Sequence, residues 1–225
     1  MQYEVIIRNL KAQSDPKAVK GMARYGINPK NNYGISVTTL RKMAKEIGTE
    51  HELALRLWAS GIRDARILAA TIDDPDMVTE EQLEKMVLDL DSWDICDHCS
   101  SDIFLKSKFA YKKAVEWSSR EEEFVKRAAF SLMARLAVRD KKAKDERFKQ
   151  FLPIIKREAD DERNYVKKAV NWALRQIGKR NRNLNRMAIK TAKEIQRMDS
   201  KSAKWIASDA LRELTSEKIQ KRLKR

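Results

Sequence analysis

Apolar residues recur about every 3.6 positions along almost the whole chain, which is the spacing of an amphipathic helix. Alternating β-branched runs, which would indicate strands, are hard to find. Helix-start signals stand at several breaks, such as Asp15 before Pro16 and Ser200 before a Lys/Ala run. The pattern therefore predicts an all-α protein with its loosest segment at 26–37. The predicted helices cover 2–12, 16–25, 38–47, 50–59, 63–72, 79–90, 93–105, 109–118, 121–137, 144–158, 163–178, 184–198 and 200–214.

The helical pattern repeats along the chain. Repeats of about 40 residues with two helices each are typical of HEAT and armadillo-like arrays, which stack into a curved solenoid with a concave face. We therefore expect a HEAT-like helical-repeat solenoid, an α-α superhelix, forming a single domain over 1–225. The aligned segments are 125–133 with 166–174 at a shift of 41, 166–177 with 203–214 at a shift of 37, and 58–60 with 117–119 at a shift of 59.

The net charge adds a functional indication. The chain has 48 Lys and Arg against 33 Asp and Glu, which gives a formal charge of +15. A field of that sign attracts polyanions, and the phosphate backbone of a nucleic acid is the commonest one. A charge excess that serves solubility alone is the alternative. It is the weaker one, since a balanced surface serves solubility equally well.

No secretory or membrane-spanning pattern is found. The first residues lack a basic region followed by an apolar stretch, and nowhere do 18 apolar residues run together. We expect a cytoplasmic protein, a monomer without a membrane partner.

The segment 91–99 concentrates chemistry, with one indole, three carboxylates, a histidine and two thiols. On a helix, Trp93 and Asp97 are four positions apart and share a face. A zinc site is disfavoured, because His98 points away from Cys96 and Cys99 and the chain has no second cysteine pair. We expect buried structural cysteines, no metal and no cofactor.

Trp172 is the second informative aromatic residue, because the repeat alignment pairs it with polar Ser131 and Asp209. We therefore expect Trp172 to face water or a groove, where it could stack on a ligand, sugar or base. Packing against a neighbouring repeat is the alternative. Trp58 and Trp117 recur at equivalent positions and are predicted packing residues. Trp205 aligns with Lys168 and receives no role.

Cations recur in the same register, as expected for contacts along a phosphate backbone. Ordinary solvated helix faces are the alternative explanation for most of them. Arg127, flanked by Val125 and an Ala pair, is the strongest candidate for a phosphate contact. The predicted DNA-contacting cations are Lys126, Arg127, Lys168 and Arg175.

These residues resemble the DNA alkylation repair protein family, the HEAT-like-repeat alkylpurine DNA glycosylases. Four segments carry the resemblance, in the order of the family and roughly at its spacing. They are Met22-Ala23-Arg24-Tyr25; Ser92-Trp93-Asp94 through Asp97 with 102–106; Arg127-Ala128-Ala129; and Trp172-Ala173-Leu174-Arg175.

The resemblance implies a C-shaped solenoid that holds duplex DNA in a basic concave groove and removes N3- and N7-alkylated purines. It implies that Asp97 is the catalytic carboxylate, that Trp93 and Trp172 are aromatic walls beside the lesion, and that Arg127 contacts the backbone. Tyr25 and Arg175 match less distinctive motifs of the family. The cysteine-rich stretch 96–99 and the very basic end 218–225 depart from the family pattern.

The residues themselves agree with such chemistry. Cleavage of an N-glycosidic bond builds positive charge on the sugar, which a fixed carboxylate and aromatic faces stabilise. An alkylated base leaves neutral, so a strong general acid is not needed. Two other functions stay open at this point: non-catalytic binding of DNA or branched DNA, and a protein-interaction scaffold.

Overall fold

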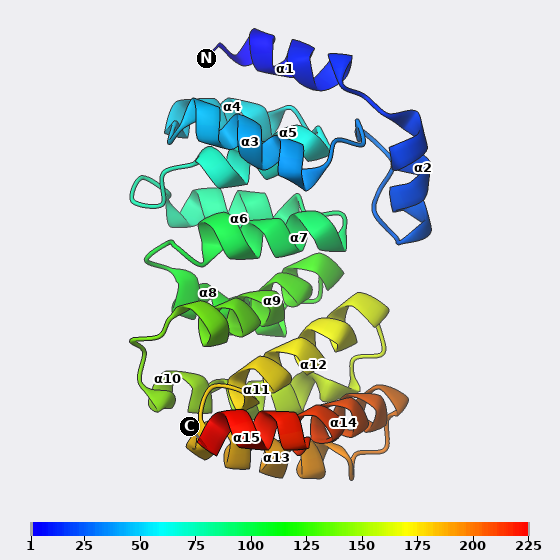
Figure 1. The fold of residues 1–225 in the computed structure, drawn as a ribbon, viewed down its shortest axis with the longest axis vertical. Coiled ribbons are helices and arrows are strands. Elements are labelled where there is room, and N and C mark those ends of the chain that lie inside the picture. Colours follow the sequence, from blue (N-terminus) through cyan, green and yellow to red (C-terminus); the bar gives the residue numbers. More distant parts are fainter. Residues whose placement is uncertain (1, 225) are drawn as a thin grey trace. The chain divides into compact units, whose positions relative to one another are not determined.

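The computed structural model describes residues 2–224, and in that range it contains helices and turns but no strand (Figure 1). The all-α prediction is therefore confirmed. The residues form two compact units, 1–109 and 110–225, and each is described here by itself. The single domain and the C-shaped curvature stay predictions. Within 2–224, no helix combines the length and apolarity needed to cross a membrane.

Unit 1 contains seven α-helices and one π-helical turn, and its helix starts follow the sequence signals. Asp15 accepts hydrogen bonds from the first backbone N–H groups of α2, with Pro16 in the first helical position. The predicted helix 93–105 is split, because its second half continues as the π-helical turn Ser100–Phe104. The α-helices are α1 (Tyr3–Ala12), α2 (Pro16–Arg24), α3 (Val37–Ile47), α4 (His51–Ala59), α5 (Arg63–Ile72), α6 (Glu80–Leu88) and α7 (Trp93–Cys99).

Unit 2 contains eight α-helices within residues 110–224. The predicted helix 144–158 is interrupted at Gln150, where Pro153 cannot donate the backbone hydrogen bond that would join the two parts. The last helix was not predicted, because it is short and Ile219 is its single buried residue. The helices are α8 (Ala110–Glu116), α9 (Glu123–Arg139), α10 (Asp145–Lys149), α11 (Phe151–Arg157), α12 (Asn164–Gly178), α13 (Arg182–Ile195), α14 (Lys201–Leu214) and α15 (Glu217–Lys224).

Neighbouring helix pairs contact each other at a regular sequence offset, as expected for stacked repeats. In unit 2, α12 packs against both α9 and α14, and side-chain contacts join residues 38 positions apart, such as Asn171 with Asp209. In unit 1 the offset is 31, as between Trp58 and Asp89. The predicted period near 40 therefore holds for unit 2. Unit 1 has a shorter period because α5 and α7 have 10 and 7 residues, against 17 for α9 and 15 for α12.

The predicted packing residues lie in the cores of their units. Trp117 is 1% exposed and Trp58 is 8% exposed, so their assignment as packing tryptophans is confirmed. Cys96 and Cys99 are buried thiols outside any disulfide, as expected of structural cysteines. Burial also raises the pKa of the Cys99 thiol, which keeps it protonated.

The segment 26–37 is better ordered than its composition predicts. Ile27, Asn32 and Ile35 are buried. Gly34 has a φ of 76°, and a Cβ atom there would lie 2.5 Å from the backbone oxygen of Asp15. This close approach explains why a glycine stands at that position and holds the segment against α2.

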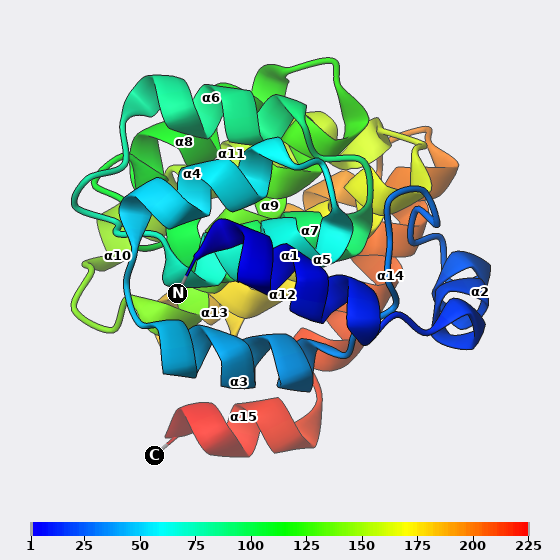
Figure 2. The same cartoon turned by 90° about the horizontal axis from the view of Figure 1, so that it is seen from above.

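Charge is distributed unevenly within unit 1. The segment 73–91, which includes α6, has eight carboxylates and one lysine in a chain that is otherwise strongly basic. Helix α3 has Arg41, Lys42 and Lys45 against one glutamate. Figure 2 shows α6 and α3 on opposite sides of this unit.

Candidate functional site

Trp93 and Asp97 lie on α7 with one helical turn between them, as the sequence predicts. Trp93 is the first residue of the helix and Asp97 is the fifth, so their side chains share a face. Both side chains are half-buried. Ser101 donates a 2.8 Å hydrogen bond from its hydroxyl to the backbone oxygen of Asp97. This bond links α7 to the π-helical turn that follows it.

The indole of Trp93 is oriented by the segment that follows α2. Its Nε1 donates a 2.9 Å hydrogen bond to the backbone oxygen of Tyr25. Close by in sequence, Asn28 donates from Nδ2 to Asp91 Oδ2 at 2.7 Å. Two contacts therefore attach the turn after α2 to the start of α7. The Tyr25 side chain is 77% exposed, which agrees with a role at a surface.

A buried ion-pair network fixes the beginning of α7. Arg63 is 4% exposed and contacts Asp94 Oδ2 through Nε at 2.7 Å and Nη2 at 2.6 Å. The Arg63 Nη1 atom lies 3.0 Å from Asp64 Oδ1. Asp64 also accepts hydrogen bonds from the backbone N–H groups of Tyr33 and Ile35. Asp94 is therefore a structural carboxylate, whereas Asp97 is part of a partly accessible face.

This network was missed at the sequence level. The signal was available, because Arg63 and Asp64 precede the apolar run of α5 and must either face solvent or be paired when buried. Which carboxylate pairs with Arg63 depends on the 31-residue offset in this unit, and the sequence repeats do not reveal that offset.

His98 follows Asp97 in the chain, and its imidazole has a shifted pKa. Burial lowers the pKa of its imidazole, and the guanidinium groups of Arg41 and Arg63 act in the same direction. The carboxylates of Asp102 and Asp94 oppose that shift without cancelling it. Among residues 2–224, no group of three or more His, Cys, Asp or Glu is arranged to hold a metal ion.

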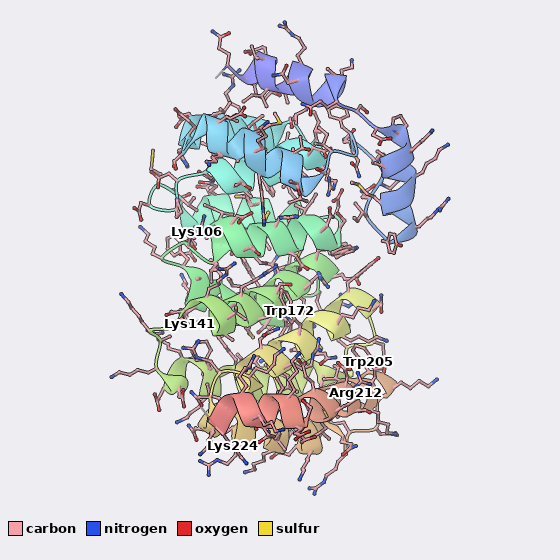
Figure 3. All side chains as sticks on the ribbon, viewed as in Figure 1. Lys106, Lys141, Trp172, Trp205, Arg212 and Lys224 are labelled. Atoms are coloured by element: carbon pink, nitrogen blue, oxygen red, sulfur yellow. The ribbon has the colours of Figure 1, made fainter. Side chains whose placement is uncertain are left out.

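In unit 2, Trp172 is half-buried on α12 (Figure 3). The guanidinium carbon of Arg135, on α9, lies 4.8 Å from the centroid of the indole. This cation–π contact was not predicted, although an arginine within the apolar run 125–137 was visible in the sequence. The repeat argument is wrong for Ser131, which is fully buried, while the partial exposure of Trp172 itself agrees with the prediction.

Lys126 and Arg127 need correction, because neither presents its charge at the surface. Lys126 is 7% exposed, and its Nζ lies 2.7 Å from Glu158 Oε2 and 3.4 Å from Asp161 Oδ2. Arg127 is 6% exposed and donates from Nη1 to the backbone oxygen of Tyr165 at 2.9 Å. The packing of α9 against its neighbours encloses both side chains, which leaves little of either charge available for a phosphate contact.

Lys168 and Arg175 are closer to the expected surface role. Lys168 is exposed on α12. Arg175 is half-buried, with Nη1 2.8 Å from Glu213 Oε2, and Lys179 shares the same glutamate at 2.8 Å. The carboxylate of Glu213 therefore offsets part of the charge of Arg175. Lys168, in contrast, lies on the solvent-exposed side of α12.

The chain is similar to several known proteins. A family model described as DNA alkylation repair enzyme matches residues 6–214. A solved structure described as a new family of proteins related to the HEAT-like repeat DNA glycosylases with affinity for branched DNA structures is 21% identical, with 95% of each chain covered and a TM-score of 0.77. Its likeness supports the HEAT-like repeat fold. A designed armadillo repeat protein is 16% identical over 79% of this chain and 92% of its own, with a TM-score of 0.37 that carries no weight. No curated protein sequence matches.

Proposed function

The chain belongs to the family of DNA alkylation repair enzymes, and on this premise we propose that it excises N3- and N7-alkylated purines from duplex DNA by hydrolysing the N-glycosidic bond. The observation that carries the proposal is the position of Asp97 one turn after Trp93 on α7, with both side chains half-buried. A carboxylate and an indole on one helix face suit a reaction whose transition state is positively charged.

The proposed reaction follows from the charges involved. As the base departs, positive charge develops on the deoxyribose, as it does in glycoside hydrolysis. The Asp97 carboxylate stabilises this charge and orients a water molecule. The water oxygen bonds to C1′, and its proton passes to the carboxylate or to solvent. The electrons of the broken bond go to the base, which is cationic when alkylated and therefore leaves neutral.

The surroundings of Asp97 support this assignment of roles. No proton donor to the base is required, which agrees with a His98 imidazole whose pKa is lowered by burial. Trp93 is held by the backbone of Tyr25, so its ring is already oriented before substrate binds. In unit 2, Trp172 with Arg135 over its ring is a second proposed aromatic contact to DNA. Tyr25, Lys168 and Arg175 remain proposed DNA contacts.

Base release from a duplex with one N7-methylguanine tests the proposal directly. We expect wild type to release the free base and Asp97→Asn to be at least about 100-fold slower, with binding to the duplex unchanged. Asp76→Asn is the matched control, since it removes an exposed carboxylate of the same unit outside α7 and is expected to keep the activity. Release by wild type no faster than the spontaneous reaction contradicts the proposal.

A second candidate is non-catalytic binding to branched DNA. It is favoured by the fold neighbour, which is described with affinity for branched DNA structures. The same assay separates the two functions when a four-way junction is added as a ligand. Tighter binding to the junction than to the duplex, with no base release, selects the second candidate.

A further inference from the structure

Trp205 is the most exposed of the five tryptophans and has no role in the reaction proposed above. It is 42% exposed on α14, whereas Trp58 and Trp117 are buried and Trp93 and Trp172 are half-buried. Leaving so large an apolar ring in water is unfavourable by the hydrophobic effect. Such a ring therefore suggests a ligand that covers it.

A cation lies over the ring of Trp205, as one also does over the ring of Trp172. The Lys167 ammonium, on α12, lies 5.7 Å from the centroid of the Trp205 ring. Likewise, the Arg135 guanidinium on α9 lies 4.8 Å from the Trp172 ring. In both pairs, the cation stands on a helix that packs against the helix of the indole, 37 or 38 positions earlier in the chain. The two tryptophans align with different repeat positions, Trp172 with Asp209 and Trp205 with Lys168, so these are two separate cation–π contacts within the same unit.

The exposed side of α14 adds further cations around this ring. Its exposed residues recur at helical spacing, so they form a single stripe that contains Trp205. The stripe itself has no carboxylate, although Lys204 lies 3.2 Å from Asp199 and Arg212 pairs with the half-buried Asp209. Figure 3 labels Trp205 and Arg212 on this helix and Trp172 on α12. The exposed residues of the stripe are Lys201, Lys204, Trp205, Ser208 and Arg212.

We propose that Trp205 binds an unpaired nucleotide of DNA, whose base or sugar packs on the indole while the stripe cations contact the flanking phosphates. Alternating rings and cations are the usual means by which proteins hold single-stranded nucleic acid. A paired duplex presents phosphates and groove edges and keeps its base faces stacked. The indole therefore selects unpaired nucleotides, and the cations alone contact paired DNA. The inference rests on the proposed function only in that DNA is the ligand.

Binding to undamaged DNA tests this inference without any readout of base release. Fluorescence anisotropy is measured for the whole chain with two labelled probes, a continuous duplex and the same duplex with a central run of unpaired thymines. We expect Trp205→Ala to weaken binding to the interrupted probe by about 10-fold and to the duplex by less than about 2-fold. Trp205→Phe, which keeps a ring, restores most of the affinity.

Lys204→Ala is the matched control on the neighbouring position. Loss of its charge weakens binding to both probes by the same factor, and the difference disappears at high salt. Because Trp205 and Lys204 are both exposed, neither change disturbs the fold, and circular dichroism verifies this. Equal affinities of wild type and Trp205→Ala for the interrupted probe overturn the inference. If the chain releases no base but Trp205→Ala still weakens binding to the interrupted probe, the proposed function is refuted and this inference stands.

Discussion

Trp93 donates a 2.9 Å hydrogen bond from its indole Nε1 to the backbone oxygen of Tyr25, 68 positions earlier in the chain. The contact joins the residue after α2 to the first residue of α7. Because the acceptor is a backbone atom, the orientation of the indole does not depend on which side chain stands at position 25. The candidate catalytic helix is thus aligned by a segment that is remote in sequence.

Trp93→Phe keeps an aromatic ring and removes the donor. We expect a loss of about 1 kcal/mol in the free energy of unfolding, the usual contribution of one hydrogen bond. We also expect faster trypsin cleavage after the exposed Arg24 and Lys30, since the turn loses one of its two attachments. Peptide mapping over time measures this. Trp205→Phe serves as the control, and equal cleavage in the two variants contradicts the assigned role of the hydrogen bond.

Asp94→Asn removes one carboxylate of the buried pair with Arg63. The guanidinium then keeps Asp64 as its charged partner, and we expect the free energy of unfolding to fall by about 3 kcal/mol. Urea denaturation is the measurement. Asp91→Asn, at an exposed carboxylate, is expected to cost less than about 1 kcal/mol. Similar losses for the two variants are inconsistent with a structural role confined to Asp94.

Lys126 and Lys168 are expected to behave in opposite ways. Lys168→Ala leaves stability within about 0.5 kcal/mol, weakens duplex binding and lowers the salt-dependence slope by about 1, because an exposed cation is lost. Lys126→Met leaves that slope unchanged and costs about 3 kcal/mol of stability, because Glu158 loses its buried partner. Affinity titrations at several salt concentrations, combined with urea denaturation, separate these results. A reduced slope in folded Lys126→Met refutes the assignment of this lysine to the interior.

His98 makes stability depend on pH. Burial lowers the pKa of its imidazole below the ordinary value of 6.5, so the unfolded chain binds the proton more readily. The contribution of neutral His98 to stability is therefore complete above that value and is lost as the pH falls through the lowered pKa. Denaturation at about pH 7.5 and about pH 5.5 measures the loss. We expect His98→Gln to lose less stability between these two pH values than wild type does. An equal loss of stability in the two proteins assigns the pH dependence to other groups.

Most helices were predictable because their apolar positions follow one period and several of their starts carry caps. Asp15 with Pro16 and Ser200 both begin helices as expected. The errors have separate physical causes. The break before Phe151 reflects a proline that the periodicity does not register, and α15 buries only Ile219, so packing against the unit, more than its own pattern, defines it.

The candidate site was predictable only where residues are local. Trp93 and Asp97 share a face because they are four positions apart, and any helix there produces that relationship. Partners from other helices could not be predicted, because they depend on how the repeats pack. The pairing of Lys126 with Glu158 and the cover of Arg135 over Trp172 are of this kind. A basic residue in the sequence does not reveal whether it meets a carboxylate or water.

The uneven charge of unit 1 makes it an electric dipole. The segment 73–91, with its eight carboxylates, includes α6, and α3 with its three cations lies on the opposite side of the unit. A polyanion exerts a torque on such a body and turns the acidic side away before contact. The unit is therefore oriented before contact, within the screening length of roughly 8 Å at physiological salt. The polyanion then makes its first contact with the basic side more often than random collisions would.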